Sequence, residues 1–442
     1  MSLGSTSFPA ELLYFILDDY RPVYDAEVIE LIQTPKVKTS KNWAPYASKL
    51  HFFAQLRLVC RAWYNFITPL LYSTFTLPTH PYEDLERAGK GLSHYPGLID
   101  RLVLRGHLGD GAAQHAAELL AACLSQCTHL RTLEILDAHR IFQSSSKSKS
   151  LAIFLAIPPT VPLDCLIFRF LRPNASSLRI YPISITLIGL GSLNQKLKTL
   201  EIHDLHRRPA IHPDDYAILG LPSSFPNLQR LVVRSPGFSE YVLSKFISRI
   251  FYKITPPLIT SGWSSARQWA TPLRDLTLFW NGTSQAAYNI LDLLKADDLG
   301  QNLTSFSIYS DPLSLKPEAS DVLLELPAKI IAACPHLEAF VYFVISPDTV
   351  FTQLPRTLKT LGLPLINDYP FYDYVWQTVK PLTLNHHKSL VDWLERTNGR
   401  GIKNLLLQRA TQGPPPGLEG VTKACLAANV ELTLSWEPAY PR

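Results

Sequence analysis

Cysteine and histidine pairs are the residues of this chain whose spacing could support metal chemistry. Cys123 and Cys127 lie four residues apart, which places two thiols on one face of a helix, as in half of a zinc site. His203 and His206 lie three residues apart and His212 follows, which is also a conceivable metal spacing. No second cysteine pair is near in sequence, and no pattern of carboxylate and histidine surrounds the histidines. We therefore interpret the cysteines as a buried helix face and the histidines as a strand exit, and expect no metal.

Motifs of the common enzyme classes do not occur in the sequence. There is no Gly-x-Ser-x-Gly nucleophile elbow, and Gly189-Leu-Gly191 lacks the third glycine and the flanking context of a phosphate-binding loop. We expect a protein that is not an enzyme and that needs no cofactor. An enzyme whose site the sequence does not reveal is a weaker alternative.

Two apolar segments near the N-terminus have the character of amphipathic helices. In the first, apolar residues stand at 8, 12, 13, 16 and 17, the spacing of one helix face. Pro9 suits a first helical turn, where its missing N–H would be unpaired anyway, and Glu11 lies near the positive end of the helix dipole. The second segment reads Leu56-Arg-Leu-Val-Cys-Arg-Ala-Trp63, followed by Pro69-Leu-Leu-Tyr72 and a strand-like Phe75-Thr-Leu77. Two ordinary core helices of a helical cap are the simpler interpretation.

The combination of these motifs resembles an F-box, a three-helix module that docks onto the Skp-type adaptor of a cullin ubiquitin ligase. The Pro-x-Glu-Leu-Leu opening, the Leu-Val-Cys-Arg-x-Trp helix and the Pro-Leu-Leu-Tyr exit carry the resemblance. It implies that adaptor contacts fall on Phe8, Pro9, Leu12, Leu13, Ile16, Leu17, Leu58, Val59, Cys60 and Trp63. In the family the two segments lie close together, whereas here residues 18–50 intervene and read as an inserted loop. We predict an F-box-like helical module over residues 1–78.

From residue 98 onward one apolar pattern returns, Leu-x-x-Leu-x-Leu or a close variant. The first seven copies start about 30 to 34 residues apart, with one larger gap before the sixth. A strand in each copy at such a period is typical of a solenoid. The copies are Ile99-Leu102-Leu104, Leu130-Leu133-Ile135, Leu163-Leu166-Phe168, Leu197-Leu200-Ile202, Leu228-Leu231-Val233, Leu273-Leu276-Leu278, Leu303-Phe306-Ile308, Leu337-Phe340-Tyr342, Leu358-Leu361-Leu363 and Ile402-Leu405-Leu407, with a last strand at Val430-Leu432-Leu434.

Helical patterns lie between several of these strands, and they set the fold class. Apolar residues recur at helical spacing over residues 110–127, 240–251, 284–295, 321–334 and 386–397. Strand and helix in alternation predict a parallel α/β horseshoe that resembles an irregular leucine-rich-repeat array, with strands inside and helices outside. We assign residues 79–442 to this solenoid and expect it to pack against the helical module as one body, because the junction is short.

Composition limits the class of partner. The chain is 46% hydrophobic and 18% charged, which is typical of a globular protein, and its net charge of +5 over 442 residues is mild. We therefore expect neither nucleic acid nor a membrane as partner. Six scattered cysteines and a first segment unlike a signal peptide predict reduced thiols and a place in the cytoplasm or nucleus.

The position just after the last apolar residue of each repeat predicts a target-binding surface. Because side chains alternate along a strand, these residues point to the concave face, and equivalent positions form a column. The column reads Arg105, Leu136, Arg169, His203, Arg234, Phe279, Tyr309 and Phe343, and a neighbouring column adds Arg101, Arg230 and Asp275. The hypothesis is a groove in which an acidic or phosphorylated segment meets the arginines and an apolar side chain meets the aromatics. A solvated face is the alternative. In the last strand of this column, which holds Phe340 and Tyr342, Val341 and Phe343 could equally be the pair that points inward.

These observations predict the substrate-recognition subunit of a Skp–cullin–F-box ubiquitin ligase. It would hold the adaptor, and through it a cullin, at the N-terminal helices and an unknown protein target at the horseshoe. A repeat scaffold that binds no ligase is the alternative, and only an adaptor-binding experiment separates the two.

Overall fold

A computed structural model describes a defined part of the chain. The described residues are 55, 57–59, 61–78, 86, 89–105, 113–136, 160–170, 196–204, 227–234, 273–280, 284–295, 299–310, 320–343, 350–365, 386–409 and 418–435. The first predicted helix, residues 8–17, the insertion at residues 18–50 and the predicted helix at residues 240–251 lie outside them.

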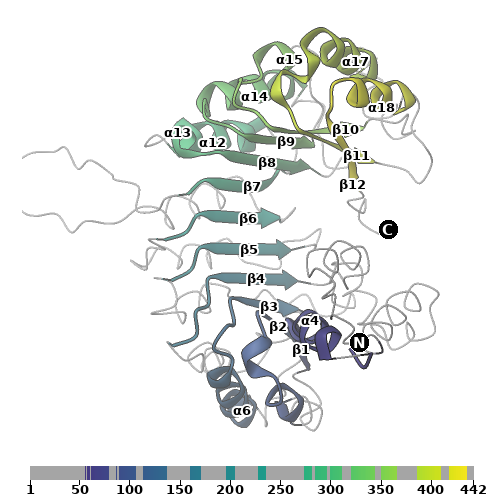
Figure 1. Ribbon diagram of the computed structural model, residues 1–442. Coiled ribbons are helices and arrows are strands. Elements are labelled where there is room, and N and C mark those ends of the chain that lie inside the picture. Colours follow the sequence, from purple (N-terminus) through teal and green to yellow (C-terminus); the bar gives the residue numbers. More distant parts are fainter. Residues whose placement is uncertain are drawn as a thin grey trace, which may run out of the picture.

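Twelve parallel strands form one open, solenoid-like sheet in which each strand pairs with its neighbours in the sequence (Figure 1). The strands are β1 (Thr74–Pro78), β2 (Arg101–Arg105), β3 (Thr132–Leu136), β4 (Cys165–Phe170), β5 (Thr199–Asp204), β6 (Arg230–Arg234), β7 (Asp275–Trp280), β8 (Ser305–Ser310), β9 (Ala339–Phe343), β10 (Thr360–Leu365), β11 (Asn404–Arg409) and β12 (Glu431–Ser435). The α/β class with parallel strands is therefore confirmed. The strand predicted at the end of the helical module, β1, is the first strand of this sheet.

Helices lie in the connections between successive strands, outside the sheet. The described ones are α4 (Arg61–Tyr72), η2 (Pro96–Leu98), α6 (Ala113–Gln126), α12 (Ser284–Lys295), α13 (Leu299–Asn302), α14 (Ser320–Ala333), α15 (Val350–Gln353), α17 (His386–Thr397), η7 (Asn398–Gly401) and α18 (Leu418–Ala427). Figure 1 shows α12 to α18 gathered beside the C-terminal strands and α4 beside β1. Four predicted helices, at residues 110–127, 284–295, 321–334 and 386–397, are confirmed as α6, α12, α14 and α17.

Each repeat contributes three inward apolar side chains to one continuous core. In the repeat that holds β3, these are Leu130, Leu133 and Ile135, which are at most 1% exposed. The same three positions are buried in the copies from β2 to β11, including the less regular copies after residue 337. Burying this much apolar surface is the main stabilising contribution to such a sheet. The pattern that defined the repeats is therefore the core of the solenoid.

A bifurcated backbone contact aligns the start of each strand with the one before it. The carbonyl of Asp100 accepts hydrogen bonds from the N–H groups of Arg131 and Thr132 at 2.8 and 3.0 Å. The carbonyls of Arg131 and Asp164 do the same for the next two strands, and the arrangement continues to Lys359 and the start of β11. Because the first residue of each strand is fixed in this way, equivalent positions of neighbouring strands come into register.

Candidate protein-interaction surfaces

The column predicted on the concave face is present in the strand register. Arg105, Leu136, Arg169, His203 and Arg234 pair successively from β2 to β6. Further along, Phe279, Tyr309 and Phe343 pair successively from β7 to β9. The structure describes Arg105, Phe279 and Phe343 by their backbone alone.

The register also settles the ambiguity at β9. Phe340 and Tyr342 are both fully buried and continue the inward columns of β8, where they pair with Phe306 and Ile308. Phe340 and Tyr342 are therefore the inward pair of β9. At the other end of the sheet, Val103 and Leu136 are each 1% exposed and form a small cluster separate from the main core, which agrees with their outward direction.

A fully buried carboxylate, Glu134 on β3, organises the arginines at the start of this face. Arg101 donates to Glu134 Oε2 from Nε at 3.1 Å and from a terminal nitrogen, and Arg169 donates from Nε to Oε1. The Glu134 side chain is 0% exposed, while those of Arg101 and Arg169 are 25% and 20% exposed. Two arginines from β2 and β4 therefore converge on one buried acid between them.

A second group of charges follows on β5 to β8. Glu201 on β5 contacts His203 Nε2 at 3.0 Å and Arg230 Nε at 3.4 Å. Arg230 also reaches Asp275 at 3.5 Å, and Asp275 accepts a hydrogen bond from Ser305 Oγ at 3.2 Å. The side chain of Arg230 is about half exposed, so its ion pairs are weaker than those of Glu134.

Burial and ion pairing compete in the pKa values of this second group. Burial would raise the pKa of Glu201, but its hydrogen bond with His203 and the charges of His203, Arg230 and Arg169 bring that pKa below its usual value. Burial lowers the pKa of His203, and the charges of Arg169 and Arg234 lower it further, against the effect of Glu201. Burial raises the pKa of Asp275, although Arg230 opposes this. The pKa of His203 therefore lies below its ordinary value, which favours the neutral ring at neutral pH.

One contact joins the arginines to the aromatic half of the face. The Arg234 guanidinium lies 4.2 Å from the ring centroid of Tyr309, although Arg234 is on β6 and Tyr309 on β8. Arginine commonly stacks on aromatic rings in this way, which combines cation–π attraction with apolar contact. The basic and aromatic parts that the sequence predicts are thus continuous here.

Two acidic residues of this face were missed by reasoning from the sequence. Glu134 and Glu201 stand between the two inward residues of their strands, as in Leu133-Glu134-Ile135. Strand alternation alone puts this middle position on the same face as the arginines, so the sequence could have placed both acids there. The charge of this face is therefore less basic than the sequence suggested, because Arg101, Arg169 and Arg230 are each paired with a carboxylate of the same face.

A second surface lies just before and along α4. Leu58 and Val59 are 68% and 66% exposed, and Tyr64 on α4 is 38% exposed. Five large apolar or aromatic side chains are exposed among the described residues, and these three lie within seven positions of one another. Trp63 is half-buried beside them. Such a concentration of exposed apolar side chains is typical of a binding surface.

Of the ten predicted adaptor contacts, Leu58 and Val59 are exposed and Trp63 is half-buried. Phe8, Pro9, Leu12, Leu13, Ile16, Leu17 and Cys60 lie outside the described residues.

Aromatic contacts connect α4 to the first repeats. Arg57 donates a hydrogen bond from a terminal nitrogen to the Tyr72 hydroxyl at 2.9 Å. The ring of Tyr72 lies 4.5 Å, between centroids, from that of Tyr95, whose hydroxyl is 3.2 Å from the Tyr64 hydroxyl. Tyr95 precedes η2, at the entrance to β2. The end of the helical segment is thereby packed onto the start of the sheet.

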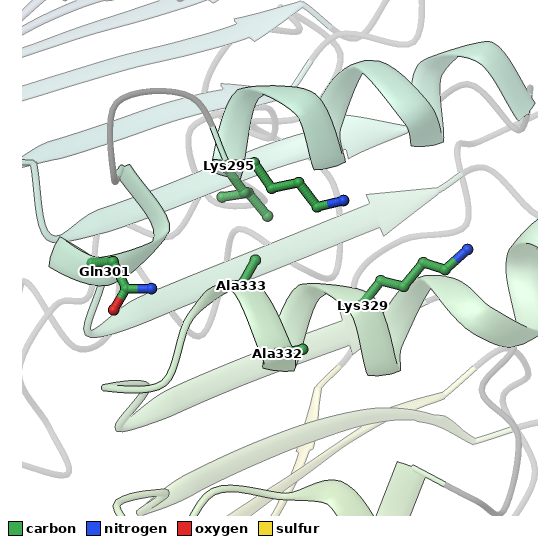
Figure 2. A pocket seen from close by; sticks show the side chains of 6 residues that line it. Lys295, Gln301, Lys329, Ala332 and Ala333 are labelled. Carbon is green, nitrogen blue, oxygen red and sulfur yellow. The ribbon is translucent and has the colours of Figure 1, made fainter.

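Another candidate for a ligand site, within the described residues, is a groove on the helical side between α12, α13 and α14 (Figure 2). It is lined by Leu294, Lys295, Gln301, Lys329, Ala332 and Ala333. The helices approach closely because residue 300 is glycine, where a Cβ atom would lie 2.3 Å from the carbonyl oxygen of Ala333. Lys329 is paired with Glu325 at 2.6 Å. The polar groups of the lining are Lys295, Gln301 and this paired Lys329.

The described cysteines and histidines bear on the metal question posed by the sequence. Burial raises the pKa of Cys123, and burial together with the charge of Cys123 raises that of Cys127 to about 12, so both are neutral buried thiols. His203 bonds Glu201, while His206 and His212 lie outside the described residues. Among the described residues, no group of three histidine, cysteine or acidic side chains is placed to hold a metal ion.

Comparison with known proteins does not identify a family for this chain. No protein-family model matches the chain, and no curated protein does so either. Within the part of the chain that the structure describes, no helix has both the length and the apolar character needed to cross a membrane.

Proposed function

We propose that this chain is the substrate-recognition subunit of a Skp–cullin–F-box ubiquitin ligase, an F-box protein with a leucine-rich-repeat-type solenoid. The observation that carries the proposal is the exposed apolar pair Leu58 and Val59, which precedes α4 within the segment that resembles an F-box. A sheet of repeats follows directly, which supports an arrangement of an adaptor-binding module followed by a target-binding solenoid.

The mechanism in this proposal is proximity. The chain raises the effective concentration of a target near the ligase by binding both at once. The contacts of Tyr72 with Tyr95 and of Tyr64 with Tyr95 support a fixed geometry between the two binding surfaces. A fixed geometry avoids the loss of effective concentration that a long flexible linker would bring.

The target surface in this proposal is the concave face from β2 to β9. Arg234 and Tyr309 are half-buried residues of two types that are enriched among interface hot spots. The paired carboxylates Glu134 and Glu201 hold arginines in place on this face, which lowers the entropy lost when a partner binds.

Adaptor binding tests the proposal. A Leu58→Glu/Val59→Glu double variant should lose binding to a Skp-type adaptor, since it puts two charges into the proposed apolar interface. Both side chains are two-thirds exposed, so the variant should fold normally. Leu426→Glu on α18 is the matched control, because Leu426 is 75% exposed and lies at the far end of the solenoid. If the wild type does not bind the adaptor, the chain is a repeat scaffold without a ligase. If the wild type and both variants bind it equally, Leu58 and Val59 do not form the contact.

A further inference from the structure

The last strand of the sheet, β12, closes the core less completely than the strands before it. On every strand from β2 to β11 the two inward side chains are at most 5% exposed. The equivalent side chains of β12, Leu432 and Leu434, are only partly buried against the core. Leu426 on α18, the helix beside β12 (Figure 1), is 75% exposed. A solenoid normally ends in a repeat with a polar outer face, whereas this end presents three leucines to solvent.

The outer edge of β12 also presents main-chain hydrogen-bonding groups. The N–H of Glu431 donates to the carbonyl of Lys403 at 2.8 Å, so the main chain of Glu431 faces β11. Successive residues of a paired strand direct their N–H and C=O groups to opposite sides, so those of Leu432 and Leu434 face away from β11. Within the described residues, no strand pairs with this outer edge. The edge is therefore a template for one more strand.

The pairing of β10 shows that this alternation holds in the sheet. The N–H of Thr360 donates to the carbonyl of Glu338 at 2.9 Å, so the alternate residue Pro364 also faces β9. Proline has no N–H to donate. Accordingly, β10 pairs with β9 only as far as Gly362, but with β11 as far as Leu365.

The opposite edge of the sheet, on β1, is blocked by a proline. The N–H of Arg101 donates to the carbonyl of Ser73 at 2.9 Å, so Ser73 faces β2. By alternation Pro78, five residues on, faces the outer edge of β1, where it removes a donor. Proline at such a position is a usual protection of an edge strand, and β12 contains none. A second copy of the chain can therefore meet β12 with its own β12 better than with its β1, which favours a closed pair over an open filament.

We propose that β12 pairs with β12 of a second copy, antiparallel about a two-fold axis perpendicular to the sheet, so that two sheets join edge to edge in a dimer. This role goes beyond ligase binding and does not depend on it. The axis keeps both cores on one side of the joined sheet, so α18 lies next to α18 of the second copy.

The position of Leu426 on α18 agrees with this arrangement. A Cβ atom at Gly420 would lie 3.8 Å from the side chain of Val391, so that side of α18 faces α17. Leu426 is six residues further and about 120° round the helix from Gly420. It therefore points away from α17, toward the end of the solenoid, where the second copy would cover it.

The side chains of β12 restrict the register of the pair. Because the main chains of Leu432 and Leu434 face outward in both copies, they must meet each other. Pairing Leu432 with Leu432 places Glu431 opposite Thr433 of the second copy, and pairing Leu432 with Leu434 places Thr433 opposite itself. Neither register sets Glu431 against Glu431, which like-charge repulsion disfavours. In both registers, a glutamate at position 433 would face another carboxylate.

Sedimentation velocity of the full-length protein tests the dimer. Over about a hundredfold range of concentration around micromolar values, the mass should rise from one chain to two, as expected of a small interface. Thr433→Glu should weaken the dimer about fivefold or more through carboxylate repulsion. Thr433 is exposed, so the variant should keep the urea midpoint of the wild type. Gln353→Glu is the matched control, because it adds the same charge at an exposed position on α15 and should leave the dimer unchanged.

Hydrogen exchange locates the contact within the dimer. The amides of Leu432 and Leu434 should exchange more slowly as the concentration of the wild type rises, and Thr433→Glu should remove this protection. Leu426→Glu should also weaken the dimer while it retains adaptor binding, so the two surfaces are tested separately. A monomer at every concentration overturns the proposal and leaves the edge to an extended segment of another protein. A dimer that Thr433→Glu does not weaken, or that leaves both amides unprotected, overturns it as well.

Discussion

Replacing Glu134 with glutamine should destabilise the protein far more than a comparable change at an exposed ion pair. Glu134 is the fully buried acid that accepts hydrogen bonds from Arg101 and Arg169. Glutamine keeps the size of the side chain and one acceptor oxygen but removes the charge. Two guanidinium groups are then left on the concave face with neither a carboxylate nor full access to water.

The magnitude can be estimated from the exposure of the three side chains. Removing one partner of a buried ion pair typically costs about 3 to 5 kcal/mol, because the other charge stays desolvated. Arg101 and Arg169 are 25% and 20% exposed, so water compensates part of the loss. We expect the free energy of unfolding to fall by about 2 to 4 kcal/mol. Glu338→Gln is the control, because its pair with Lys359 is about half exposed on both sides and contributes about 1 kcal/mol at most.

Equilibrium unfolding in urea, followed by far-ultraviolet circular dichroism, measures the difference. With a common slope, the shift in midpoint converts to a change in the free energy of unfolding. The midpoint of Glu134→Gln should fall several times further than that of Glu338→Gln. Equal midpoints for the two variants would refute the view that a buried acid organises the concave arginines.

Three further predictions concern buried polar groups. The pKa of His203 in the folded protein is below its unfolded value of about 6.5, so the unfolded chain binds more protons there and stability falls as pH drops below about 6.5. Between pH 7.5 and 5.5 the urea midpoint of His203→Gln should therefore fall less than that of the wild type. An equal fall would contradict this expectation. Cys334 is fully buried, and burial raises the pKa of its thiol to about 12. It should therefore resist alkylation at pH 8 until urea is added, and rapid labelling of Cys334 in the native protein would count against its burial. The Tyr342 hydroxyl is buried without a hydrogen-bond partner, so Tyr342→Phe should raise the free energy of unfolding by about 1 kcal/mol. Tyr288→Phe, at an exposed site, should leave it unchanged. A loss of stability in Tyr342→Phe would show that the hydroxyl does have a hydrogen-bond partner.

The sequence was sufficient to predict the solenoid because its signal is local. Each repeat needs three inward apolar side chains within six residues, as at Leu358, Leu361 and Leu363, and this requirement survives changes in the length of the connections. The later repeats were therefore predicted correctly despite their irregular spacing. Helix α17 was predicted over the residues it occupies, because its apolar positions recur at helical spacing.

The chemistry of the concave face was predicted only in part, because its contacts are not local. The column of outward residues followed from strand alternation, and the register confirms it. The pairing of Arg169 with Glu134 joins residues 35 positions apart on neighbouring strands, and it becomes visible only when the register is known. The stacking of Arg234 on Tyr309 depends in addition on an arginine side chain reaching past an entire strand.

Adaptor binding by the full-length chain tests the central claim most directly. Isothermal titration of a purified Skp-type adaptor into the wild-type protein, the Leu58→Glu/Val59→Glu variant and the Leu426→Glu control gives three dissociation constants under one set of conditions. Truncation of a well-packed interface anchor commonly costs about 2 kcal/mol or more, which is about thirtyfold in affinity, so we predict binding by wild type and control and a loss of at least that size in the double variant. Absence of binding by the wild type would contradict the proposed ligase function, and equal binding by all three proteins would contradict the assignment of Leu58 and Val59 to the interface.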